Sequence, residues 1–188
     1  DFFFARNIVI AFLPSAVIGA LFYSVIRDVL FSVYVVSVSL IVGGFLIIII
    51  EKTVKKPVHH AIEDFSLKTV LLIGLARCCA MIPGVSRSGA TIMGSLVFGV
   101  ERKTATEFSF FLAIPTMFGA TVYNIYKNYE VLNFDDIWLI GIGFFSAFLA
   151  ALAVVRVLIN FVGTHGFIPF AYYRIALGIG ILCFLMWK

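Results

Sequence analysis

Long apolar runs dominate this sequence and constrain its fold more than any other feature. Residues 8–26 and 32–50 are almost entirely apolar, and about 20 apolar residues are enough for a helix to cross the hydrocarbon of a bilayer. Three further runs of this kind cover 104–126, 136–162 and 171–187. A chain in contact with lipid must satisfy its own backbone hydrogen bonds, so these runs predict transmembrane helices. We therefore expect an all-α, polytopic integral membrane protein, folded as a helical bundle.

The composition agrees with lipid as the outer solvent. Of the 188 residues, 62% are hydrophobic and 13% are charged, whereas soluble domains are about half apolar and a quarter charged. The net charge is +4. Because the basic residues fall in short loops, we interpret this charge as a signal that holds those loops in the cytoplasm, and we expect no nucleic-acid partner.

A re-entrant hairpin is predicted in the middle of the chain. Residues 69–82 and 88–100 are apolar, but each arm is only about 14 residues long, which is short for a membrane crossing. Between them lies a Pro-Gly break at Pro83 and Gly84. Irregular backbone at membrane depth persists only where protein or a wet cavity satisfies it. Two short arms around such a break indicate a helix pair that enters the membrane and returns.

The charges of the flanking loops favour the same topology. The segment 51–68 before the hairpin carries four lysines, and Arg102 and Lys103 follow the hairpin. If the hairpin returns to the face it left, both basic segments share the cytoplasmic side, as the positive-inside rule prefers. The loop 127–136 contains three acidic residues and suits the outside.

The order of these elements predicts an inverted repeat within a single membrane domain, 1–188. A hairpin followed by three spans crosses the membrane an odd number of times, so a preceding copy would be inverted. Residues 69–188 would form the second repeat, with its hairpin at 69–100, and residues 1–50 would end the first. Because the sequence begins with Asp1 and not with Met, we expect the first hairpin and span to precede it.

The break of the hairpin, at residues 83–91, carries the side chains that are candidates for binding or catalysis. An arginine inside an apolar hairpin is costly, so Arg87 marks a functional site, and its planar fork of donors fits phosphate oxygens in pairs. Hydroxyl groups, and glycines that permit close backbone approach, complete the motif: Ser86, Ser88, Thr91, Gly84 and Gly89. Free amides at the start of the second arm add to an anion site. The motif predicts a bound oxyanion; the alternative is a serine-rich helix cap with Arg87 neutralised by an internal carboxylate.

At these residues the sequence resembles a known family. The run 80–92, Ala-Met-Ile-Pro-Gly-Val-Ser-Arg-Ser-Gly-Ala-Thr-Ile, resembles the signature of the bacterial undecaprenyl-diphosphatases, also known as bacitracin-resistance proteins. Segments 107–110, with Pro115, and 167–174 are similar to later segments of that family, and Gly43-Gly44 to an earlier one. The resemblance covers essentially the whole sequence. It implies an inverted repeat with two re-entrant hairpins.

The resemblance also implies an activity and a location. The family hydrolyses undecaprenyl diphosphate to undecaprenyl phosphate and inorganic phosphate, which recycles the lipid carrier for peptidoglycan synthesis. The reaction supports cell wall biogenesis and cell shape, and it confers resistance to bacitracin. The implied location is the bacterial inner membrane, with an active site that opens to the outer side and with membrane lipid and a lipid-linked diphosphate as partners. A transporter or flippase of the phosphorylated carrier is the alternative, since transporters commonly contain inverted repeats; the oligomeric state stays open.

Within the resemblance, the motif residues take separate roles. Arg87 would clamp the diphosphate and stabilise the charge that develops at phosphorus, while Ser86 and Thr91 would hold oxygens or supply a nucleophile. The implied diphosphate-binding set is Gly84, Ser86, Arg87, Ser88, Gly89 and Thr91. A divalent cation, magnesium or calcium, is the implied cofactor. Its carboxylate ligands belong to a family motif expected upstream of Asp1, so we expect no metal ligand in this chain.

Three charged residues keep two interpretations each. Arg77 stands where the family has glutamine, and it either pairs with a carboxylate or adds a second phosphate contact. Glu107 is either a carboxylate at the start of a helix, near Arg102 or Lys103, or a member of the site. Arg174 enters its span near the inner face, where we interpret it as snorkelling to the membrane surface rather than touching the substrate.

Overall fold

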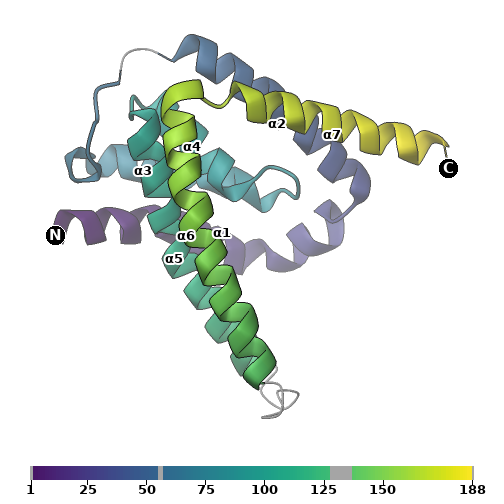
Figure 1. Ribbon diagram of the computed structural model, residues 1–188, viewed down its shortest axis with the longest axis horizontal. Coiled ribbons are helices and arrows are strands. Elements are labelled where there is room, and N and C mark those ends of the chain that lie inside the picture. The colour runs from purple at the N-terminus through teal and green to yellow at the C-terminus, as the bar shows by residue number, and fades with distance from the viewer. Residues whose placement is uncertain (1, 55–56, 128–136, 188) are drawn as a thin grey trace.

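The protein is helical, and its architecture is that of a polytopic membrane protein (Figure 1). The computed structural model describes residues 2–54, 57–127 and 137–187. Five helices within these residues are long and apolar enough to cross a membrane. They are α1 (Phe2–Leu30), α2 (Val33–Thr53), α5 (Arg102–Lys127), α6 (Ile137–His165) and α7 (Ile168–Trp187). The expected all-α, polytopic fold is confirmed, and each predicted span overlaps one of these helices.

The predicted hairpin is present as two short helices around a break. The first arm is α3 (Leu67–Cys78), which continues into a 3-10 turn at Cys79–Met81, and the second arm is α4 (Arg87–Val97). The arms pack directly against each other. At Gly94 a Cβ atom would lie 2.6 Å from Cβ of Ala76, so the glycine allows this close approach.

Both ends of the hairpin lie at the same end of the molecule. The segment that leads into α3 is hydrogen-bonded to the segment that leaves α4: the amide of Val58 donates to the carbonyl of Gly99 at 2.7 Å, and the amide of Glu101 donates to the carbonyl of His59 at 3.0 Å. The hydroxyl of Thr104 donates to the carbonyl of His60 at 2.7 Å. The two basic segments are therefore neighbours, as a returning hairpin requires.

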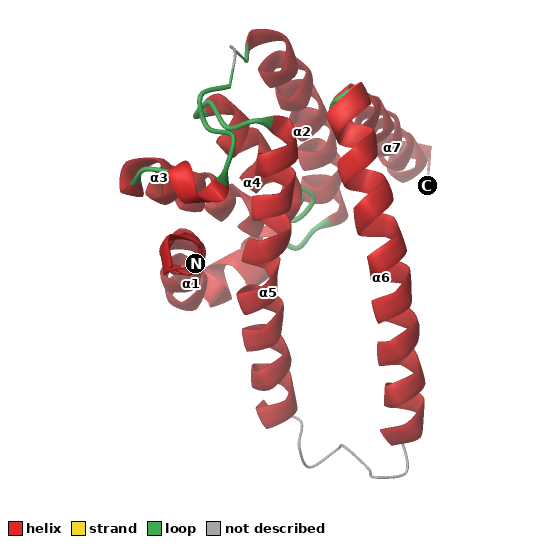
Figure 2. Cartoon of the chain, turned by 60° about the vertical axis from the view of Figure 1, so that its left-hand side comes forward, coloured by secondary structure: helices red, strands yellow, loops and turns green. Residues whose placement is uncertain are grey.

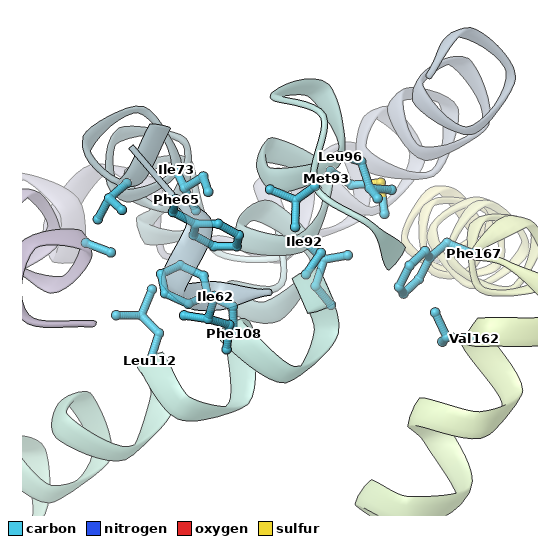
Figure 3. Close-up of a cluster of buried hydrophobic side chains, with 14 of the residues drawn as sticks. Ile62, Phe65, Ile73, Ile92, Met93, Leu96, Phe108, Leu112, Val162 and Phe167 are labelled. Atoms are coloured by element: carbon cyan, nitrogen blue, oxygen red, sulfur yellow. The ribbon is translucent and has the colours of Figure 1, made fainter. Parts of the chain in front are cut away.

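A buried apolar cluster anchors the arms of the hairpin on α5 (Figure 3). Phe108 and Leu112 of α5 are fully buried against Ile73 of α3 and the preceding turn. The rings of Phe65 and Phe108 meet edge to face, with centroids 5.2 Å apart. Ile92 of α4 belongs to the same cluster. The core thus holds the two arms, α3 and α4, against α5, whereas the tip between them is held by other contacts.

Glycines let α7 pack closely on α2, and Figure 1 shows the two helices side by side. A Cβ atom at Gly44 would lie 2.9 Å from the carbonyl oxygen of Ala171, and one at Gly178 would lie 2.8 Å from the carbonyl oxygen of Ser37. In membranes such small residues bring helix backbones together where lipid gives no hydrophobic drive for association. This packing brings the N-terminal half of α7 to the hairpin.

The inverted repeat within a single membrane domain stays a prediction. Helices α5 and α6 extend together beyond the others (Figure 2). The acidic residues predicted to face the outside, Glu130, Asp135 and Asp136, lie outside the described residues.

Candidate functional site

The predicted motif forms the break between α3 and α4. Gly84 has a φ of 94° and Ser86 a φ of 50°, so the chain turns through the left-handed region twice. For a residue other than glycine this conformation costs about 1–3 kcal/mol, and such strain clusters at functional sites. The hydroxyl oxygen of Ser86 accepts a hydrogen bond from the amide of Gly89 at 3.2 Å. Ser86 thereby caps α4 and sets the direction in which Arg87 and Ser88 leave the tip.

Two cavities flank the tip. The larger has a volume of about 810 Å³ and is lined by Arg77 and Arg87, together with Thr116; we call it the arginine cavity. The smaller, of about 400 Å³, we call the serine cavity. The motif contributes Gly84, Ser86, Ser88 and Gly89 to its lining, and further polar side chains come from α5 and α7: Ser109, Tyr173 and Arg174. The structure therefore divides the predicted binding set, with the guanidinium of Arg87 on one side of the tip and the serine hydroxyls on the other.

Thr91 lies away from both cavities. It is fully buried, one turn along α4 from the tip, and its hydroxyl donates to the carbonyl of Arg87 at 3.0 Å. Ser95 repeats this pattern by donating to the carbonyl of Thr91 at 2.8 Å. The hydroxyl of Thr91 is thus engaged by its own helix, and its predicted contact with substrate stays a prediction.

Arg174 is the residue that sequence reasoning placed wrongly. Its Nη2 donates to the carbonyl of Gly84 at 2.8 Å and reaches the carbonyl of Ser39 at 3.5 Å, while its buried Nε has no partner among the described residues. Gly43 makes room for it, since a Cβ atom there would lie 2.5 Å from Nη2. Arg174 therefore faces the hairpin tip and does not snorkel. The sequence signal was present: an arginine within an apolar run marks a site by default.

Arg77 has no carboxylate partner in the part of the chain that the structure describes. Its side chain is buried, with 4% of the residue exposed, and its Nη2 donates to the hydroxyl of Thr116 at 2.6 Å. The ion pairs found are those of Arg102 with Glu51 and of His60 with Glu101. Within the described residues Arg77 therefore forms no ion pair with a carboxylate, and its two interpretations stay predictions.

Glu107 is half-buried on α5 and lines neither cavity, so its two interpretations stay open. Its expected neighbour Arg102 pairs instead with Glu51, with Nε 3.1 Å from Oε2. Oε1 of Glu51 also accepts from the amide of Phe167 at 2.9 Å. Through these two contacts Glu51 joins the end of α2 to the starts of α5 and α7, on the side of the basic segments. Glu51 and Arg102 therefore have a structural role.

The described residues suit an anion better than a cation. Arg77 and Arg87 meet in one cavity, and no group of three or more His, Cys, Asp or Glu side chains in the described ranges could hold a metal ion. These residues do not fit a divalent cation by themselves. The site therefore offers charge and hydrogen-bond donors to phosphate oxygens.

Known proteins match this chain over nearly its whole length. A family model described as "Bacitracin resistance protein BacA" matches residues 1–180. Undecaprenyl-diphosphatase 2 of Paramagnetospirillum magneticum is 55% identical over 178 residues, which is 95% of this chain and 68% of that protein. Undecaprenyl-diphosphatase of Sphingopyxis alaskensis is 54% identical over 185 residues, 98% of this chain and 70% of that protein. Undecaprenyl-diphosphatase 2 of Shewanella oneidensis is 55% identical over 178 residues, 94% and 67% of the two chains.

Proposed function

The chain belongs to the bacitracin resistance protein family, and we propose that its hairpin tip binds the diphosphate group of undecaprenyl diphosphate. The reaction is hydrolysis to undecaprenyl phosphate and inorganic phosphate, and it confers bacitracin resistance. In this proposal, the undecaprenyl phosphate that is formed serves again as the lipid carrier for peptidoglycan synthesis. The observation that carries the proposal is the pair of arginines, Arg77 and Arg87, in one cavity at the break of a membrane hairpin.

Arg87 acts by position and charge. Phosphoryl transfer proceeds through a transition state whose charge is spread over the equatorial oxygens, so catalysis depends on positioning and electrostatic stabilisation. A guanidinium can hold two such oxygens at once. Arg87 is the first residue of α4, so the positive end of the helix dipole acts on the same anion. The dipole and the guanidinium both favour the phosphate oxygens in the arginine cavity.

Ser86 is placed to assist from the other side of the tip. Its exposed side chain lines the serine cavity beside Ser88, with their hydroxyl oxygens 3.4 Å apart. Of the two hydroxyls predicted to hold oxygens or attack phosphorus, that of Ser86 is accessible, whereas that of Thr91 is spent on its own helix. We therefore assign the contact with substrate oxygens to Ser86. A divalent cation, when bound, would neutralise phosphate charge, but the described residues supply no ligand set for it.

Hydrolysis and transport of the lipid diphosphate predict different results in two assays. We expect the purified, intact protein in detergent to release inorganic phosphate from undecaprenyl diphosphate with repeated turnover. In sealed vesicles, a flippase would instead move the labelled lipid between leaflets and leave the diphosphate intact. Movement without phosphate release would favour the transporter and contradict the enzyme.

The arginine cavity supports an opening to the outer side of the inner membrane. Its lining on α5 comes from Thr116 to Tyr123, in the half of the helix nearer Lys127. Helix α5 has 26 residues and spans about 39 Å, so this half lies far from the basic segments that flank the hairpin. We propose that those segments face the cytoplasm and that substrate enters from the opposite face.

Single cysteines test this orientation. In a background without Cys78, Cys79 and Cys183, cysteines at Lys52 and Lys103 should react with a membrane-impermeant reagent only from the cytoplasmic side. Both lysines are exposed; Lys52 lies in the last turn of α2, before the hairpin, and Lys103 in the first turn of α5, after it. A cysteine at Tyr126, at the far end of α5, should react only from the outside. Labelling of Lys52 and Lys103 positions from opposite faces would contradict the returning hairpin.

A further inference from the structure

Arg77 carries a buried charge that no carboxylate among the described residues balances. It lies in the last turn of α3 with only 4% of its surface exposed. The hydroxyl of Thr116 accepts from its Nη2 at 2.6 Å and donates its own hydrogen to the carbonyl of Leu112 at 2.7 Å. Thr116 is therefore oriented by its own helix and in turn fixes the guanidinium of Arg77.

Most donors of this guanidinium are left for a ligand. An arginine side chain has five N–H donors and no acceptor, and the bond to Thr116 is the one that the described residues supply. A buried charge without a counter-ion is costly. Arg87 makes the cost larger, because it lines the same cavity and its charge repels that of Arg77. Two cations that share one cavity favour an anion with at least two charged groups.

Most of the rest of the arginine cavity is apolar, and the hydroxyl of Ser15 there donates to the carbonyl of Phe12 in its own helix. Its walls come from α1, the hairpin and α5, and include Phe12, Ala16, Met81, Ala120 and Tyr123. A free inorganic anion would gain nothing from such walls. A lipid whose head group is a diphosphate matches both parts, with two phosphates for two arginines and a hydrocarbon chain for the apolar surface.

We propose that Arg77 is a second diphosphate-binding residue, which holds one phosphate group while Arg87 holds the other. The inference rests on the proposed function and deepens it by assigning specificity. A lipid diphosphate engages both arginines, whereas the lipid monophosphate left after hydrolysis engages one. Arg77 thus favours substrate over product and helps the product to leave.

The test compares diphosphate with monophosphate binding in Arg77→Gln. The family resemblance places glutamine at this position, so the fold should accept it. The readout is competition by a non-hydrolysable methylene-diphosphonate prenyl analogue and by the prenyl monophosphate. We expect the analogue to bind about tenfold more weakly or worse, as loss of a charge-assisted hydrogen bond predicts, and the monophosphate to change by about twofold or less. KM for the diphosphate should rise more than kcat falls.

Matched variants separate specificity from general damage. Lys68→Gln removes a positive charge from the exposed start of the same helix and should leave the diphosphate preference unchanged. Arg77→Lys, which restores charge without the fork, should recover part of the preference. Thr116→Val keeps the shape of its side chain but removes the acceptor that orients Arg77, and it should weaken the preference in the same direction by about threefold.

The possible results separate failure of the proposed role of Arg77 from failure of the proposed hydrolysis. If the preference of Arg77→Gln for the diphosphate analogue over the monophosphate stays within twofold of wild type, the role of Arg77 is overturned. Equal losses for the two ligands, together with a lower unfolding temperature, would show a structural role and also overturn it. If Arg77→Gln does not yield a monodisperse protein, an unchanged preference in Thr116→Val decides against the proposal. Absence of phosphate release from the wild type would instead refute the proposed function.

Discussion

Replacing Arg87 with lysine in the intact enzyme is expected to lower kcat/KM for undecaprenyl diphosphate by about 100-fold or more. Lysine keeps the positive charge, so long-range attraction of the diphosphate survives. It loses the planar fork that holds two oxygens at once. Removing one preorganised donor to a developing oxyanion commonly costs about 100-fold to 1,000-fold in rate. The loss should appear in kcat, because the contact strengthens as charge develops in the transition state.

Phosphate release from purified wild type and variant measures this effect. Lys103→Arg is the matched control, because Lys103 is exposed at the start of α5, in the segment expected outside the membrane, and lines neither cavity; it should retain wild-type activity. Both variants should elute as monodisperse protein with similar unfolding temperatures, since Arg87 is exposed at the tip. Activity of Arg87→Lys within about threefold of wild type would remove Arg87 from the site.

The positions of the helices and of the hairpin could be predicted from the sequence because membrane insertion depends on length and apolarity alone. A run of about 20 apolar residues must form a helix in lipid. Two runs of about 14 residues on either side of Pro83 and Gly84 are short for a crossing and indicate a hairpin that returns. Arg87 could be recognised for the same reason, since a charge at membrane depth needs a function. These inferences require no knowledge of which helices touch.

The division of the motif into two cavities could not be predicted, because it depends on three-dimensional contacts. The directions of Arg87 and Ser88 follow from the positive φ of Ser86, which local sequence does not reveal for a serine. The place of Arg174 depends on Gly43, which lies more than a hundred positions away in the chain and leaves space for the guanidinium. Thr91 is different: a threonine in a helix often bonds to the carbonyl four residues earlier, and that pattern was visible in the spacing of Arg87 and Thr91.

Gly84→Ala should cost both stability and activity. Gly84 has a φ of 94°, which side chains other than glycine's adopt at a cost of about 1–2 kcal/mol. An added Cβ atom would also lie 2.6 Å from the carbonyl oxygen of Val36 in α2, and relief of such overpacking costs about 1–3 kcal/mol. We therefore expect a stability loss of about 2–5 kcal/mol. Because the tip must move away from α2, the bond from Arg174 to the carbonyl of Gly84 should break, and activity should fall about tenfold or more.

Thermal unfolding in detergent and phosphate release together measure this change. Gly180→Ala in α7 is the matched control, because a Cβ atom there meets nothing within 4 Å. Alanine in a helix should leave stability unchanged or raise it by about 0.5–1 kcal/mol, with wild-type activity. A Gly84→Ala variant that unfolds at the wild-type temperature and keeps full activity would mean that the tip does not rest on α2. The orientation of Arg87 toward Arg77 would then lose its structural basis, since the packing of Gly84 on α2 and the cap at Ser86 together aim Arg87 into the arginine cavity.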